Sequence, residues 1–273
     1  MRGSVISLAV SAKTEAGEEK LVSSLTRVVL IVEYEGTRYH GFQLQANMPT
    51  IQGEIEEALL NLTGKRTRVG AASRTDTGVH ALEQVVSFRT ASSLPARAFV
   101  SGLNYYLPKD IAVKAAYEVK DLVNVRRDAL SREYRYYILN SLTRSPIKDG
   151  FYHLVIPRLD IGAMNRASEA LIGEHDFASF ASCLGGTMKS TVRKVYRAET
   201  ERDGELVIFN MLASSFLPHQ VRNTVGALIR VGLGKMGLAE FNSILEAKEP
   251  GLAGPAAPAC GLYLTHINYP YSF

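Results

Sequence analysis

Hydrophobic positions in the first half of the chain alternate between short continuous runs and helical spacing. Residues 28–34 (VVLIVEY) form an apolar run typical of a buried strand. Residues 51–62 then carry apolar side chains three and four positions apart, and Thr50 and Gly64 are suited to begin and end a helix there. Three further elements follow, namely a strand at 85–88, a helix that Pro95 opens and that runs through Leu103, and a strand at 111–119. The predicted order is strand, helix, strand, helix, strand.

A similar order begins again in the second half. Residues 133–139 (EYRYYIL) alternate as a strand does, and Asp160 can cap a helix over the following segment, DIGAMNRASEALIG. The remaining predicted elements are a hairpin that turns at Asp203-Gly204, two helices and a closing strand, at 194–211, 217–229, 241–245 and 261–267.

These patterns predict two similar α+β halves, although no close sequence repeat relates them. The junction falls between Ala116 and Arg132. We therefore divide the chain into an N-terminal extension (1–26), an N-terminal α+β half (27–120) and a C-terminal α+β half (121–273). If the sheets of the two halves meet, the cleft between the halves is the natural place for a functional site.

Composition narrows the class of protein only slightly. The chain has 273 residues, of which 46% are hydrophobic, as in an ordinary globular protein. Its 31 basic and 27 acidic residues give a net charge of +4, which permits a polyanionic partner without requiring one. Cys183 and Cys260 lie far apart without a C-x-x-C spacing, which favours reduced thiols and predicts a cytoplasmic protein.

The first 25 residues faintly resemble a secretion signal, with Arg2 followed by an apolar stretch from Val5 to Val10. Two serines and the shortness of the stretch argue against that function, so we interpret the segment as an N-terminal extension. No run in the chain is long enough to span a membrane, and no membrane partner is expected.

The stretch ASRTDTGVHA (72–81) places one carboxylate, Asp76, beside an arginine and a glycine. One interpretation is a simple turn, in which Asp76 accepts hydrogen bonds from nearby backbone amides and Gly78 supplies an unusual backbone conformation. That interpretation leaves Arg74 unexplained.

A second interpretation is an aspartic peptidase, because Asp-Thr-Gly is the signature of that class. Such enzymes need two carboxylates that share a proton, and this sequence holds a single copy of the signature. A homodimer could supply the second copy, but such a chain would be much shorter. Its signature would also follow an apolar strand and not the polar residues Ser73 to Thr75.

The third interpretation rests on a wider pattern, in which five blocks occur in order between Val28 and Pro270. The blocks are EYEGTRYHGFQLQ, SRTDTGVHALEQVVSF, REYRYYILN, SSFLPHQVRNTVGALIRVG and GLYLTHINYP. Together they resemble the TruA family of tRNA pseudouridine synthases. Two departures are visible, since Ser73 replaces a glycine and Gln220 replaces a methionine of the family pattern.

The resemblance implies a pseudouridine synthase fold, in which two similar halves form a central, largely antiparallel sheet with an active-site cleft between them. It implies isomerisation of uridine to pseudouridine in the anticodon stem-loop of tRNA, at positions 38–40, by a homodimer without a cofactor. The histidines show no H-x-H or H-E-x-x-H spacing, so we also predict no catalytic metal. A catalytically idle RNA-binding protein on the same fold is the alternative.

The resemblance also assigns roles to single residues. It implies that Asp76 is the nucleophile, that Arg222 pairs with it, and that Tyr134 packs against the target uracil. Arg74 would fill the gap left by the flipped base, and Arg126 would contact RNA. The intact set of Asp76, Arg74, Tyr134 and Arg222 argues against a catalytically idle protein.

Two segments rich in arginine and tyrosine, 126–137 and 189–197, offer phosphate contacts beside stacking surfaces. Such charge runs are usually solvated strand faces, and the RNA interpretation rests on their occurrence beside the other motifs. Tyr136 and Tyr137 are interpreted as ordinary strand residues on opposite faces. His80 is interpreted as a hydrogen-bonded structural group outside catalysis.

Overall fold

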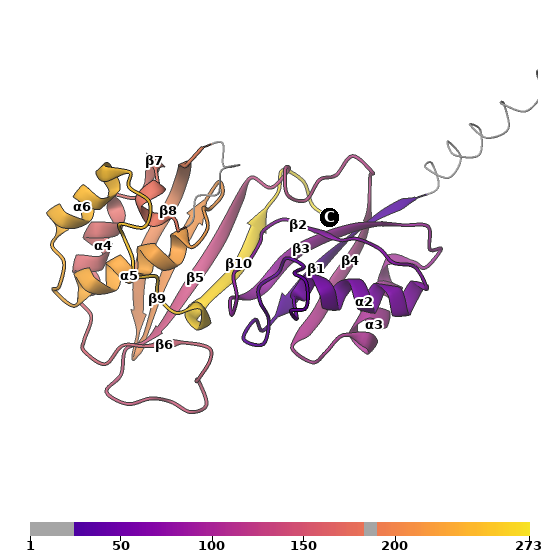
Figure 1. Ribbon diagram of the computed structural model, residues 1–273, viewed down its shortest axis with the longest axis horizontal. Helices are drawn as coiled ribbons and strands as arrows, with labels where there is room; N and C mark the ends of the chain where they lie inside the picture. Colours follow the sequence, from indigo (N-terminus) through magenta and orange to yellow (C-terminus); the bar gives the residue numbers. More distant parts are fainter. Residues whose placement is uncertain (1–24, 183–189) are drawn as a thin grey trace, which may run out of the picture.

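The computed structural model describes residues 25–182 and 190–273. Its centre is a ten-stranded sheet in the order β4-β1-β3-β10-β5-β9-β8-β7, with the short strands β2 and β6 paired to β3 and β5 (Figure 1). The pairs β10 with β3 and β6 with β5 are parallel, and the other pairs are antiparallel. The predicted α+β fold with a largely antiparallel sheet is confirmed. The interpretation of the first 24 residues, and of Cys183 and Lys189, concerns positions outside the described residues.

The N-terminal elements follow the predicted order, with the short strand β2 in addition. They are β1 (Thr26–Tyr34), α2 (Ile51–Thr63), β2 (Gly70–Ala71), β3 (His80–Thr90), α3 (Ala96–Tyr106) and β4 (Ile111–Val119). Thr50 caps α2 by accepting a hydrogen bond from Gly53 N at 3.2 Å, and Gly64 ends it with a φ of 71°. Helix α3 follows Pro95 as predicted but continues beyond Leu103.

The C-terminal elements match the predicted types except for two short strands that were not predicted, β6 and β7. They are β5 (Ser131–Leu139), β6 (His153–Leu154), α4 (Ile161–Glu169), β7 (Gly173–Asp176), β8 (Val192–Asp203), β9 (Leu206–Ala213), α5 (Gln220–Gly232), α6 (Leu238–Ala247) and β10 (Leu262–Asn268). Asp160 caps α4 through Ala163 N at 2.9 Å. The helix ends at Glu169, earlier than predicted, and Gly173, with a φ of 112°, begins the edge strand that pairs with β8.

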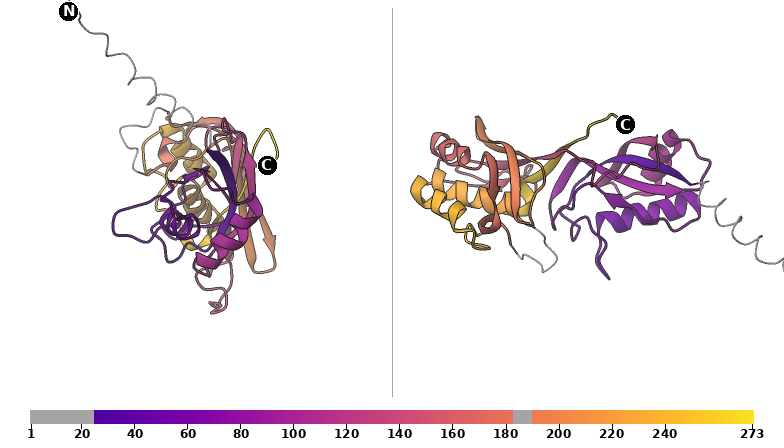
Figure 2. Two further views of the ribbon diagram at one scale, coloured as in Figure 1. Left: turned by 90° about the vertical axis from the view of Figure 1, so that its right-hand side faces the viewer. Right: turned by 90° about the horizontal axis from the view of Figure 1, so that it is seen from above.

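Strand β10 joins the two halves of the sheet, since it lies between β3 of the first half and β5 of the second (Figure 1). Its contact with β3 is short and parallel, with Tyr263 opposite His80 and Leu264 opposite Ala81. Helices α2 and α3 cover the N-terminal part of the sheet, whereas α4, α5 and α6 gather on the C-terminal part (Figure 2). The predicted division at residue 120 falls in the connection from β4 to β5 and stays a prediction.

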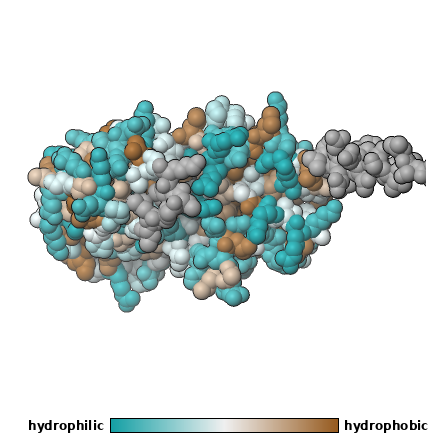
Figure 3. Space-filling model, turned by 45° about the horizontal axis from the view of Figure 1, so that its top comes forward, coloured by the Kyte–Doolittle hydropathy of each residue, from teal (hydrophilic) through white to brown (hydrophobic). Residues whose placement is uncertain are grey.

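The burial of β1 explains its continuous apolar run. The strand lies between β3 and β4, so both of its edges are paired, and Val28, Val29, Leu30 and Val32 are almost completely buried. The face shown in Figure 3 mixes hydrophilic and hydrophobic residues without a broad apolar patch. Among the described helices, none combines the length and apolar character that a membrane crossing needs.

Candidate active site

The Asp76 loop connects β2 to β3 and is held by the segment that follows β1. Phe42 N donates to the Thr75 carbonyl oxygen at 3.0 Å, and Gly78 N donates to the Tyr39 carbonyl oxygen at 3.3 Å. These bonds fix the backbone on both sides of Asp76, so the direction of its side chain is set by the fold.

Two glycines in the segment after β1 are required by the close approach of these loops. A Cβ atom on Gly36 would collide with the Val79 carbonyl oxygen. One on Gly41, whose φ is +83°, would lie 2.7 Å from the Thr75 carbonyl oxygen. Glycine is the residue that avoids both problems. The structure thereby supplies a physical reason for the glycine spacing in EYEGTRYHGF.

A buried hydrogen-bond network supports the loop from the side of the sheet. The hydroxyl groups of Tyr34 and Thr75 lie 2.7 Å apart. Gln84 donates to the Ser73 carbonyl oxygen at 2.9 Å and accepts from Ser73 N at 3.3 Å. Sequence reasoning missed Tyr34 and Gln84, although a glutamine before the apolar run VVSF was a usable signal, since a buried amide needs polar partners.

The Asp76 carboxylate points toward the start of α5. Its Oδ2 atom lies 3.6 Å from Arg222 Nη1 and 3.5 Å from His219 Nε2, and the side chain is 31% exposed. A turn does form, because Val79 N donates to the Asp76 carbonyl oxygen at 3.1 Å. Within the described residues, however, no backbone amide donates to the carboxylate, so capping that turn does not account for the side chain.

Arg222 lies in the first turn of α5, and the fold brings it to Asp76. Its Nε atom donates to the Ala257 carbonyl oxygen at 2.8 Å, and Ala257 N donates back to the Arg222 carbonyl oxygen at 2.9 Å. This pair of bonds fixes the guanidinium group and leaves its Nη atoms directed at the carboxylate.

His219 is a second neighbour of the Asp76 carboxylate that sequence reasoning missed. It immediately precedes α5 and has a φ of 59°, a left-handed conformation that is uncommon for residues other than glycine. This backbone conformation turns the imidazole toward Asp76. Its position three residues before Arg222, at the start of a predicted helix, was the available signal, since residues at that spacing share a helix face.

Tyr134 approaches the same loop from β5 and is 6% exposed. Its hydroxyl lies 3.0 Å from Ser73 Oγ, and its ring meets the edge of Phe216 at a centroid distance of 5.1 Å. Burial raises the pKa of Tyr134 to about 12, with the Ser73 hydrogen bond opposing the shift and the charge of Asp76 adding to it. The hydroxyl is therefore protonated at neutral pH and available as a hydrogen-bond donor.

These side chains surround one open pocket of about 750 Å³. Its lining includes all five residues that the sequence singled out, namely Arg74, Asp76, Arg126, Tyr134 and Arg222. The volume is within the range of sites that enclose a small ligand. Among the described lining residues, Asp76 is the single acidic one.

Arg132 corrects part of the interpretation of segment 126–137 as a source of phosphate contacts. The side chain is buried and donates to four backbone carbonyl oxygens, those of Ala72, Arg126, Ala129 and Ser214. Burial lowers its pKa. Arg132 ties the Asp76 loop to the loop that carries Arg126, and the phosphate-contact interpretation is wrong for this residue.

His80 lies outside the pocket and is 1% exposed. Its Nδ1 atom accepts from Gly36 N at 3.1 Å, and its ring stacks on Tyr263 at a centroid distance of 4.6 Å. Burial lowers the pKa of His80, which favours a neutral structural ring. In the parts of the chain that the structure describes, no group of three or more His, Cys, Asp or Glu side chains is placed to hold a metal ion.

A family model described as tRNA pseudouridine synthase matches residues 30–128 and 167–270. The chain belongs to this family of isomerases, and the predicted family and enzyme class are confirmed. The aspartic peptidase interpretation is thereby excluded.

Several curated relatives are named tRNA pseudouridine synthase A. The chain is 43% identical over 245 residues to one from Exiguobacterium sp., a match that covers 90% of this chain and 98% of the relative. It is 42% identical over 246 residues to one from Acetivibrio thermocellus, with 90% and 100% covered. It is 39% identical over 249 residues to one from Legionella pneumophila, with 90% and 94% covered.

Proposed function

We propose that this protein isomerises uridine to pseudouridine in tRNA and that Asp76 is its nucleophile. One observation carries the proposal. Among the described residues of the pocket Asp76 is the single acidic one, and its carboxylate faces Arg222. A carboxylate is ionised at neutral pH, and a fixed guanidinium group can keep it oriented for reaction.

The reaction needs a nucleophile, a pocket for an extruded base and exclusion of water. The bond between N1 of the uracil and C1′ of the ribose breaks, the base turns, and a bond from C5 to C1′ forms. C5 loses a proton and N1 gains one, so the reaction consumes no cofactor. Attack of the carboxylate on the ribose, its addition to the uracil ring and a route through a glycal all require Asp76 beside the nucleoside.

Tyr134 supplies an aromatic face for the extruded uracil, and stacking on such a face contributes about 1–3 kcal/mol per base. Its protonated hydroxyl can donate to the base and assist proton movement at C5. Arg74 is exposed and lines the pocket, so it can replace the extruded base in the RNA stack, and the exposed Arg126 can contact RNA.

The substrate region is proposed to be the anticodon stem-loop, with a homodimer binding one tRNA and working in the cytoplasm. A folded stem-loop is recognised largely through its shape and phosphates. Short uridine oligomers are therefore expected to be poor substrates.

The experiment is to incubate the purified protein with an unmodified tRNA transcript and to map pseudouridine by position. Pseudouridine in the anticodon stem-loop supports the proposal. Binding of the tRNA without any pseudouridine would instead identify the catalytically idle RNA-binding protein.

A further inference from the structure

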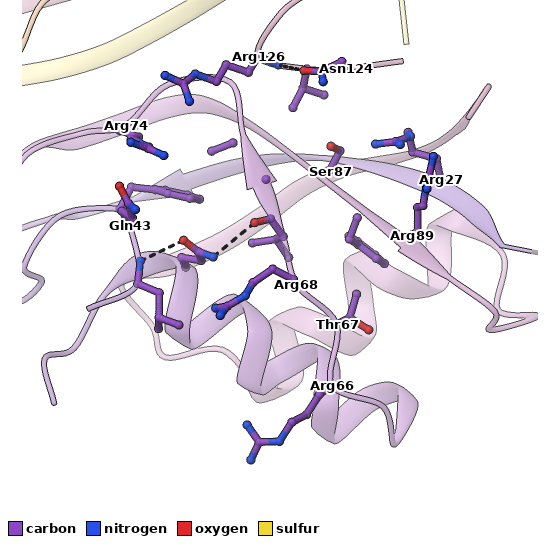
Figure 4. A pocket seen from close by; sticks show the side chains of 18 residues that line it. Arg27, Gln43, Arg66, Thr67, Arg68, Arg74, Ser87, Arg89, Asn124 and Arg126 are labelled. Atoms are coloured by element: carbon purple, nitrogen blue, oxygen red, sulfur yellow. Dashed lines mark hydrogen bonds between the residues drawn. The ribbon is translucent and has the colours of Figure 1, made fainter. Parts of the chain in front are cut away.

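A turn at residues 124–128, between β4 and β5, carries Arg126 to the wall of the pocket that surrounds Asp76. Asn124 closes this turn, because its Oδ1 atom accepts from Arg126 N at 3.2 Å and from Arg127 N at 3.0 Å (Figure 4). Asparagine commonly closes turns in this way. These bonds shape the turn locally but do not attach it to the sheet.

Two tyrosines from the segment that follows β10 supply that attachment. The Tyr269 hydroxyl donates to the Val125 carbonyl oxygen at 2.6 Å, and the Tyr271 hydroxyl donates to Asp128 Oδ2 at 3.0 Å. Burial raises the pKa of Tyr269. Burial, together with the bond to Asp128, raises the pKa of Tyr271 to about 12. Both hydroxyl groups are therefore protonated at neutral pH and act as hydrogen-bond donors.

The two peptide groups that flank Arg126 have all of their polar atoms paired. Their N–H groups donate to Asn124, and their carbonyl oxygens accept from Tyr269 and from Arg132, the latter at 2.7 Å. The direction in which the Arg126 side chain leaves the turn is thereby fixed. Its guanidinium group is exposed and makes no ion pair with the described residues. A fixed backbone that carries a free cation is preorganised to bind an anionic ligand.

Aromatic contacts hold the two tyrosines in place. Their rings stack on each other at a centroid distance of 5.7 Å, and Phe273 meets the rings of Tyr269 and Tyr271 at 4.9 and 5.6 Å. Phe273 in turn stacks on Tyr117 of β4 at 6.2 Å. Packing of this kind needs the rings and not the hydroxyl groups. The hydroxyl bonds to the turn can therefore be removed while the aromatic packing is kept.

We infer that Tyr269 and Tyr271 are positioning residues, which hold Arg126 in the orientation in which it contacts RNA. The inference rests on the proposed function, in which Arg126 touches the substrate. Neither tyrosine lines the pocket around Asp76, so both act through the turn. Without their hydroxyl bonds the turn must be ordered when RNA binds, and this ordering consumes part of the binding free energy.

The test is a double-mutant cycle between the two tyrosines and Arg126. The variant Tyr269→Phe/Tyr271→Phe keeps both rings and removes both hydroxyl groups. In the wild-type protein, Arg126→Gln should raise the Kd for tRNA roughly fivefold, as loss of one contact to a polyanion does. In the double variant the same change should raise it by less than about twofold. Equal penalties in the two backgrounds would overturn the inference, and so would an unchanged Kd for Arg126→Gln in the wild-type protein.

Tyr263→Phe is the matched control. The Tyr263 hydroxyl also donates to a backbone carbonyl oxygen, that of Phe151, at 3.2 Å, and neither residue lines the pocket. In this background Arg126→Gln should keep its full penalty. A reduced penalty would mean that loss of any tyrosine hydroxyl near β10 disturbs Arg126, and would contradict a specific role for Tyr269 and Tyr271.

Hydrogen exchange reports on the turn without RNA and without activity. The amides of Arg126 and Arg127 should exchange roughly fivefold faster in Tyr269→Phe and in Tyr271→Phe, and at the wild-type rate in Tyr263→Phe. These single variants keep the inference testable if the double variant misfolds. Unchanged exchange in both would overturn it. Failure of the proposed function is read separately, as absence of pseudouridine in wild-type incubations, and leaves the exchange rates and the Kd values unaffected.

Discussion

The Asp76 pocket and a neighbouring hollow share three lining residues but are built in different ways. The hollow has a volume of about 940 Å³, and its lining includes six arginines, namely Arg27, Arg66, Arg68, Arg74, Arg89 and Arg126 (Figure 4). Asp76 lies on a loop that buried hydrogen bonds hold, through Tyr34, Gln84 and Arg132. Five of the six arginines of the hollow are exposed, and ion pairs near the surface hold Arg27, Arg68 and Arg89. Buried hydrogen bonds contribute about 1 kcal/mol each, and surface pairs often less. Substitutions in the pocket should therefore affect chemistry and stability, whereas those in the hollow should affect affinity and its dependence on salt.

The largest effect is expected for Asp76→Asn, which keeps the shape of the side chain and removes its charge. Pseudouridine formation should fall below detection, while tRNA binding persists because phosphate contacts elsewhere supply most of the affinity. The free energy of unfolding should change by about 1 kcal/mol or less, since loss of the ion pair and relief of a partly desolvated carboxylate oppose each other.

The measurement for Asp76→Asn is pseudouridine yield, melting temperature and tRNA affinity on one preparation. Substantial yield from a folded variant that still binds tRNA would remove Asp76 from the chemistry and return it to the role of a turn residue.

Tyr134→Phe should have the next largest effect. The variant keeps the aromatic face and loses the hydroxyl, so tRNA affinity should persist while turnover falls by roughly 100-fold, as is usual when a proton-transfer group is removed. Single-turnover and steady-state kinetics separate these effects. Unchanged turnover would limit Tyr134 to packing against the base.

His219→Asn tests the partner of Asp76 that the sequence did not reveal. Asparagine tolerates the left-handed backbone conformation, so the fold should be retained. The His219 side chain is 38% exposed, and a contact of this kind is worth about 1 kcal/mol or less, so turnover should fall by no more than roughly fivefold. His219→Gly is the matched control for the backbone conformation. If His219→Asn lost turnover as completely as Asp76→Asn, His219 would have a direct chemical role.

The smallest effect is expected for Ser73→Gly, which restores the residue of the family pattern. The change removes the contact between the Ser73 and Tyr134 hydroxyl groups but leaves both backbone bonds to Gln84. Stability should fall by about 1 kcal/mol or less, and turnover should stay within roughly twofold of wild type. A large loss of turnover, measured beside the melting temperature, would show that this serine orients Tyr134 for the reaction.

The sequence predicted most helices and strands correctly, because neighbouring residues largely decide where such elements begin and end. Thr50, Gly64 and Asp160 act as helix ends in the way their side chains allow. Helix α4 was predicted too long, because the edge pairing of Gly173–Asp176 with β8 depends on a distant segment.

The sequence blocks that resemble the family pointed to Asp76, Tyr134 and Arg222 as site residues. The fold brings these three residues to one pocket. Arg132 was misread since its neighbours in sequence are exposed arginines, whereas its burial arises from backbone carbonyl oxygens far along the chain. His219 was missed because its approach to Asp76 depends on one backbone dihedral angle. Neither the burial of Arg132 nor the dihedral angle of His219 can be read from the local sequence, although the spacing of His219 and Arg222 was a signal for the latter.

The position of β10 has a consequence for how the chain folds during its synthesis. On the ribosome, β3 and β5 emerge long before the strand that must be inserted between them, and pairings between distant segments form slowly. Until β10 is present, Asp76 and Tyr134 belong to two units that no described strand pairing connects. A nascent chain therefore carries Asp76, Tyr134 and Arg222 before β10 joins the two halves of the sheet, and the insertion of β10 acts as the closing step of their assembly.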